Sequence, residues 1–96
     1  MQKLAQHNVH YGLGWGRVAI RNTRSRWGSC SKKGNLNFNY RIVLLPEHLQ
    51  DYLAVHELCH LKHFNHSKNF WNLVAEAVPN YLHCRAQLAR WRPQKK

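Results

Sequence analysis

The chain has 96 residues, with 15 Lys and Arg against only four Asp and Glu, which gives a formal net charge of +11. This length suits one domain, and a hydrophobic fraction of 44% excludes an intrinsically disordered chain. The positive charge is compatible with nucleic-acid binding through a basic surface, although charge alone identifies no partner. We therefore expect a single domain over residues 1–96.

The three cysteines, Cys30, Cys59 and Cys84, include no C-x-x-C pair. This pattern argues against a disulfide framework and against a thiolate zinc finger, and free thiols fit a reducing compartment. The first residues lack the apolar segment of a signal peptide, and no run approaches the length of a membrane-spanning helix. We expect a cytoplasmic protein with no membrane partner, and none of these patterns specifies an oligomeric state.

Two runs in the first half of the chain have strand character. Residues 16–21 (GRVAIR) predict a short strand, and residues 35–44 give the clearest signal, because apolar side chains from Leu36 to Leu44 alternate with polar ones. Between the two runs, glycine, serine and lysine residues predict turns around a short extended segment. We expect these segments to form a small, mostly antiparallel sheet.

The second half of the chain has helical periodicity. Pro46 suits the first turn of a helix that we expect over residues 46–63. Ser67 is a favourable N-cap for a second helix over residues 67–78, and a third is expected over residues 80–91. Strands followed by three helices indicate an α+β domain.

The first predicted helix carries the sequence His56-Glu57-Leu58-Cys59-His60, an H-E-x-x-H motif. Residues four apart lie on one face of a helix, so His56 and His60 can both bind one metal ion. Glu57 then lies near the ion without binding it, where it can take a proton from the attacking water and pass it to the leaving group. The motif therefore predicts a zinc site with Glu57 as the catalytic general base.

A catalytic zinc ion takes three protein ligands and keeps one open position. His66 follows His60 by six residues, and a straight helix would carry it about 9 Å further along the axis, so the chain must first turn. Asn65 tolerates the left-handed conformation that ends many helices, and it could bring His66 back. We favour His66 as the third ligand, with Glu76 on the next helix as the alternative. His63 is better suited to contact the substrate or another ligand.

Four sequence runs together resemble the YgjP-like metallopeptidase family, over about residues 16–91. They occur in the order SRWGSC (25–30), NLNFNYRIVLLP (35–46), VHELCHL (55–61) and NHSKNFW (65–71). Members are zincin-type metal-dependent hydrolases, similar in their sites to the SprT-like proteases. The resemblance implies a zincin-like fold with a central H-E-x-x-H helix, Glu57 as general base, and the zinc ligands His56, His60 and His66. It also implies an additional N-terminal part in relatives, which this chain would lack or have shortened.

Several neighbouring side chains have structural explanations. We expect Cys59 to be a small buried residue rather than a ligand. Arg24 and Arg26 are candidates for binding a substrate carboxylate or phosphate. Three aromatic residues are expected to pack in the core: Trp27, Phe70 and Trp71.

Three functions are compatible with this sequence. The first is a zinc-dependent metallopeptidase that hydrolyses a peptide or protein substrate laid along a sheet edge. The second is a zinc hydrolase that acts on a nucleotide or phosphate substrate, which the positive charge would attract. The third is a basic, metal-stabilised nucleic-acid-binding module without turnover.

Overall fold

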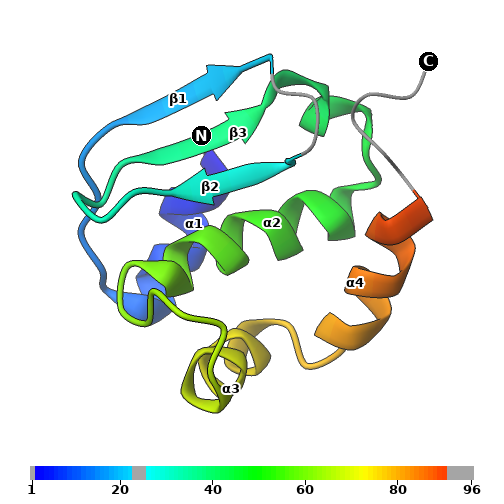
Figure 1. Cartoon of the computed structure of the whole chain (residues 1–96). Helices are drawn as coiled ribbons and strands as arrows, with labels where there is room; N and C mark the ends of the chain where they lie inside the picture. Colours follow the sequence, from blue (N-terminus) through cyan, green and yellow to red (C-terminus); the bar gives the residue numbers. More distant parts are fainter. Residues whose placement is uncertain (1, 23–25, 91–96) are drawn as a thin grey trace.

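A central helix separates the sheet from the two C-terminal helices. The computed structural model describes residues 2–22 and 26–90. In it, α2 (Glu47–His60) has the three strands on one side and α3 (Lys68–Ala77) and α4 (Tyr81–Arg90) on the other (Figure 1). A further helix, α1 (Gln2–Tyr11), packs against α2 and was not predicted from the sequence. None of the helices in these ranges is long and apolar enough to cross a membrane.

The sheet contains β1 (Val18–Arg21), β2 (Gly28–Cys30) and β3 (Leu36–Asn39), in the order β1-β3-β2. β1 runs parallel to β3, whereas β2 runs antiparallel to it. The sheet is therefore mixed rather than mostly antiparallel. The chain reverses once between β1 and β2 and again in the turn before β3, so β3 has the direction of β1. The same path leaves β2 as an edge strand.

The predicted strand over residues 35–44 ends early, at Asn39. The chain then enters the 3-10 helix η1 (Tyr40–Leu44), because the Asn39 side chain accepts a hydrogen bond of 2.8 Å from the Arg41 backbone N–H. A side chain that caps the backbone in this way competes with the hydrogen-bond ladder of a sheet. Ile42 is buried as expected, but two apolar side chains predicted on the same face are exposed: Tyr40 and Leu44.

The three predicted C-terminal helices are present, with shifted ends. Pro46 is the N-cap of α2 rather than a residue of its first turn, and α2 ends at His60. Ser67 caps α3 as predicted, because its side chain accepts a hydrogen bond from the Phe70 N–H at 3.3 Å. The predicted end of the third helix, at Trp91, lies outside the described residues.

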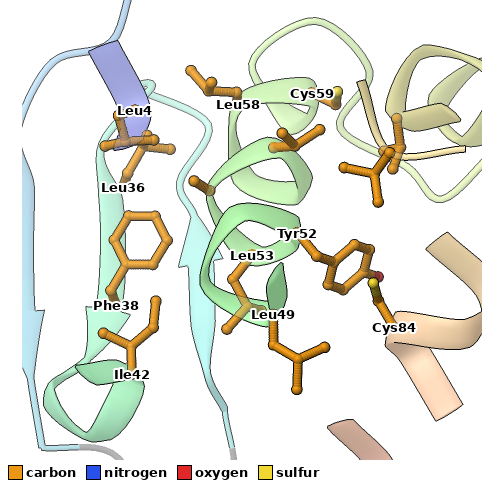
Figure 2. Close-up of a cluster of buried hydrophobic side chains, with 14 of the residues drawn as sticks. Leu4, Leu36, Phe38, Ile42, Leu49, Tyr52, Leu53, Leu58, Cys59 and Cys84 are labelled. Carbon is orange, nitrogen blue, oxygen red and sulfur yellow. The ribbon is translucent and has the colours of Figure 1, made fainter. Parts of the chain in front are cut away.

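The buried side chains surround α2 on both sides. Leu36 and Phe38 of β3 face α2 from the sheet, and on the opposite side Tyr52 of α2 lies beside Cys84 of α4 (Figure 2). Cys59 is buried, as predicted. A helix enclosed in this way has little freedom to shift, so it can hold functional side chains in fixed positions.

Salt bridges attach α1 to α2. Lys3 Nζ lies 3.0 Å from both Glu47 Oε2 and Asp51 Oδ1, and His7 Nε2 lies 3.0 Å from Asp51 Oδ1. Burial opposes ionisation of Asp51, but the hydrogen bonds from His7 and Lys3 outweigh it, so the pKa of this carboxyl lies below its usual value.

We expect this attachment to weaken in acid. A carboxyl with a lowered pKa in the folded protein stabilises the fold above its unfolded pKa of about 3.9, and this stabilisation is lost as the pH falls through the folded pKa. Asp51→Asn should therefore reduce the free energy of unfolding by about 1 kcal/mol at pH 6, and by much less near pH 3. Urea denaturation at both pH values measures this, and an equal loss at both would contradict it.

Candidate metal centre

Three imidazoles converge at the C-terminal end of α2. His56 and His60 come from successive turns of the helix, and His66 precedes α3. The Nε2 atoms of His60 and His66 lie 3.0 Å apart, and one ligand atom from each of the three rings lies within 4.8 Å of the others. Two nitrogens bound to one tetrahedral zinc ion are about 3.4 Å apart. The three side chains are therefore close enough together to hold one metal ion, and they are the one such group in the described ranges.

The chain turns toward the site directly after α2. The last turn tightens, because Leu61 donates its backbone N–H to the Leu58 carbonyl and Lys62 donates to the Cys59 carbonyl, each three residues back. Within residues 2–22 and 26–90, glycines alone have a positive φ, so the predicted left-handed turn at Asn65 is wrong. A right-handed C-cap and the start of α3 bring His66 back instead.

Hydrogen bonds orient the two helical imidazoles. His60 Nδ1 lies 3.2 Å from the His63 carbonyl oxygen, and His56 Nδ1 lies 3.2 Å from Glu57 Oε2. A carbonyl oxygen and a carboxylate oxygen accept, so each Nδ1 donates and leaves Nε2 as the nitrogen for a metal. His63 thus contacts His60 through its backbone carbonyl, and a contact of its side chain with the substrate stays a prediction.

Aromatic rings of α3 support the same imidazoles. His60 stacks on Phe70, with ring centroids 4.4 Å apart, and His66 stacks on Trp71 at 5.7 Å. Phe70 is fully buried, while Trp27 and Trp71 are partly buried against the core, as predicted for these three residues. The start of α3 therefore fixes the ring orientations.

Two of the imidazoles, those of His60 and His66, have an environment that favours the form that binds metals. Burial lowers the pKa of His60 and of His66, and the neighbouring His56 lowers both further. A lowered pKa favours the neutral ring at neutral pH, and only a neutral imidazole can donate its lone pair to an ion.

Glu57 is buried beside these rings. Its side chain is 3% exposed, and Oε1 has no hydrogen-bond partner among the residues that the structure describes. A buried carboxylate oxygen without a partner is costly, so its presence in a folded protein calls for an explanation, such as a catalytic role or a bound ion. This oxygen is available to accept a hydrogen bond from a bound molecule.

β2 leaves room for the Glu57 carboxylate because residue 28 is glycine. A Cβ atom at Gly28 would lie 3.0 Å from Glu57 Oε2, 3.3 Å from its Cγ and 3.1 Å from the Asn37 carbonyl oxygen. Glycine inside a strand often marks such a close approach. The short strand therefore covers Glu57 without displacing it.

We expect Gly28→Ala to reduce the free energy of unfolding by about 1–3 kcal/mol, because the added methyl group overpacks this contact. The loss should be smaller in a Glu57→Ala background, where the carboxylate is absent. Thermal unfolding of the parent, the two single variants and the double variant measures the coupling between residues 28 and 57. Ser29→Ala is a control in the same strand. Equal losses in both backgrounds would show that Glu57 is not the side chain in contact.

A cavity of about 320 Å³ opens over the imidazoles and Glu57. It is lined by Arg26, Gly28, Ser29, Cys30, His56, Glu57, His60, Phe64 and His66. Arg26 was predicted as an anion-binding residue, and Arg24 lies outside the described residues. β2 forms one wall, and as an edge strand it can pair with an extended chain. The cavity thus combines a potential metal site with a surface for a peptide.

Other residues near this site differ from the sequence prediction. Glu76, the alternative third ligand, is not brought to the cluster; it lies 2.9 Å from His10 on α1. Cys30 of β2 lines the cavity but was not predicted to do so. Burial, and then the nearby Glu57, raises the pKa of its thiol to about 11, so the thiol is neutral at pH 7. The one feature of the sequence that pointed to β2 as a wall of the cavity was Gly28 inside a short extended run.

An α+β fold whose central helix carries an H-E-x-x-H motif is typical of zincin-type metal-dependent hydrolases. The family model of the YgjP-like metallopeptidase domain matches residues 1–91, and the chain belongs to this family of metal-dependent peptidases. The resemblance seen in the sequence is thus confirmed, and the match also includes α1.

Solved structures show the same fold. The metallopeptidase zymogen abylysin of Pyrococcus abyssi has a TM-score of 0.83 at 24% identity, covering 93% of this chain and 90% of that one. The metallopeptidase zymogen jannalysin of Methanocaldococcus jannaschii has a TM-score of 0.78 at 20% identity, covering 93% and 92%. No curated protein matches the chain.

Proposed function

We propose that the chain is a zinc-dependent metallopeptidase in which Glu57 is the general base and the metal ligands are His56, His60 and His66. One observation carries this proposal: three imidazole ligand atoms lie within 4.8 Å of one another, beside a buried carboxylate with an unpartnered oxygen. Three imidazoles with an open fourth position are a known ligand set for catalytic zinc. When bound, zinc supplies Lewis acidity, which makes water more acidic and polarises a carbonyl group.

Glu57 moves the proton in this mechanism. Its Oε2 accepts the hydrogen bond from His56 Nδ1, so Oε1 is left to accept the proton of the attacking water. The same carboxyl group then donates that proton to the departing amine. Burial beneath β2 separates this transfer from bulk solvent.

The outer edge of β2 is the surface that we assign to the substrate. A peptide or protein segment in extended conformation can pair with this edge, which brings its backbone over the cavity. Hydrolysis of a nucleotide or phosphate substrate, and nucleic-acid binding without turnover, stay as the alternatives to be tested. The three cysteines are free, which supports the proposed cytoplasmic location.

The test is metal-dependent cleavage of peptides. The purified protein would be stripped of metal with a chelator, reloaded with one equivalent of zinc, and incubated with casein and with a mixed peptide library. We expect mass spectrometry to find new peptide ends in the reloaded sample and none in the stripped sample. Absence of cleavage by the zinc-loaded protein would contradict the proposal, and turnover of nucleotides instead would support the second function.

A further inference from the structure

A second cavity adjoins the one over the imidazoles. It has a volume of about 350 Å³ and shares two lining residues with the first cavity, His60 and Phe64. The remaining lining residues are Ser31, Lys32, Gly34, Leu61, Lys62 and Asn65. A molecule bound at the metal centre can therefore extend into the second cavity.

Two exposed lysines give this second cavity its charge. Lys32 lies in the turn between β2 and β3, and Lys62 follows the end of α2. Leu61 and Phe64 add apolar surface beside them. The cavity thus combines two positive charges with a surface for the methylene groups of a side chain.

In the described ranges, no side-chain carboxylate forms an ion pair with either of these lysines. The chain has four acidic side chains, and each of them lies beside a basic residue other than Lys32 or Lys62. Glu47 and Asp51 pair with Lys3, Glu76 lies against His10, and Glu57 lies against His56. No ion pair of Lys32 or Lys62 occurs within the part of the chain that the structure describes. Their charge is therefore available to a ligand.

We propose that the second cavity is a specificity subsite that selects a glutamate or aspartate side chain of the substrate. This inference rests on the proposed peptidase function and names its substrate class. The side-chain carboxylate would lie between the Lys32 and Lys62 ammonium groups, and the side-chain methylenes would contact Leu61 and Phe64.

The geometry also predicts where this acidic residue lies in the substrate. β2 runs from Gly28 toward Cys30, and the chain continues to Lys32 beside the second cavity. A substrate paired antiparallel with β2, the more stable of the two pairings, runs in the opposite direction. It therefore passes the second cavity before it reaches Glu57. The acidic side chain lies on the N-terminal side of the scissile bond, which excludes the substrate's terminal carboxylate as its source.

Peptide binding tests this subsite without requiring turnover. One peptide cleaved by the zinc-loaded protein, acetylated and amidated at its ends, would be made with a single Glu or Gln at each position around the scissile bond. Calorimetry with zinc-loaded Glu57→Gln then compares the paired peptides. We expect Glu to bind about five- to tenfold more tightly than Gln at one position on the N-terminal side, in 50 mM salt.

Matched lysine variants separate the subsite from the general positive charge. In Lys32→Gln/Lys62→Gln the preference for Glu should fall below about twofold, because surface charge alone discriminates weakly between neighbouring positions. Lys33→Gln, in the same turn but outside the cavity lining, should keep the preference. Lys62→Glu should shift the preference at that position from Glu toward Lys.

The subsite would be wrong if Glu and Gln bound equally at every position, or if the preference survived in Lys32→Gln/Lys62→Gln. A preference only on the C-terminal side would also overturn it. If no cleaved peptide were found, the same comparison of Glu with Gln would be made at each position of decapeptides that are capped at both ends. Position-specific binding of Glu, with no hydrolysis of these peptides by the zinc-loaded parent protein, would then contradict the proposed peptidase function and leave the subsite standing. Hydrolysis without a Glu preference would remove the subsite alone.

Discussion

Glu57→Gln is expected to lower kcat by about 10²–10⁴-fold while zinc stays bound. Gln has nearly the shape of Glu, so the side chain still fits beneath Gly28, but its amide cannot take a proton from water. Glu57 does not belong to the group of side chains that could hold the metal ion, so the metal content should not change. Steady-state kinetics on a cleaved peptide, with elemental analysis of the same sample, measures both quantities.

Glu76→Gln is the matched control for this experiment. Glu76 is exposed on α3 and lies against His10, so loss of its charge should leave kcat unchanged. Full activity in Glu57→Gln would show that the general base is another group. Loss of zinc from Glu57→Gln would show that Glu57 helps to hold the metal.

His66→Ala is expected to abolish tight zinc binding and, with it, the stabilisation that zinc provides. A ligand present at about 1,000 times its Kd stabilises the folded protein by about 4 kcal/mol. His66 is exposed, and its ring contacts lie within the site, so the metal-free variant should unfold close to the metal-free parent. Elemental analysis and thermal unfolding with and without zinc measure these two effects.

His63→Ala provides the comparison for His66→Ala. The backbone carbonyl of His63, and not its ring, contacts His60, so this variant should keep one zinc ion per chain. A His66→Ala protein that retained its zinc would show that the third ligand lies elsewhere. Zinc content of Glu76→Ala would then test the alternative considered from the sequence.

The cluster of three imidazoles was largely predictable, because local geometry determines it. Any helix brings His56 and His60 to one face, and His66 is too close in sequence to lie far from them. The route of the intervening turn was not predictable in the same way. Asn65 permits a left-handed turn but does not require one, and backbone hydrogen bonds at the end of α2 produced a right-handed one.

The walls of the site depend on contacts between distant parts of the chain. β2 has three residues, too few for a periodic pattern, and it lies beside Glu57 only because β3 positions it. Lys32 and Lys62 meet at one cavity for the same reason. α1 was missed because its sequence is mostly polar. It is held by Leu4, which is buried in the common core, and by salt bridges to α2 that have no local signature.

The three imidazoles and Glu57 all come from residues 56–66, and this has a consequence for folding kinetics. Loops of about ten residues close in roughly 10–100 ns, far faster than distant strands pair. The proposed ligands can therefore gather, and a metal ion can bind to them, before the sheet has formed. An ion that binds the partly folded chain accelerates folding more than it slows unfolding. It also stabilises the native state by less than its affinity for the native protein indicates, since the unfolded chain retains some of that affinity.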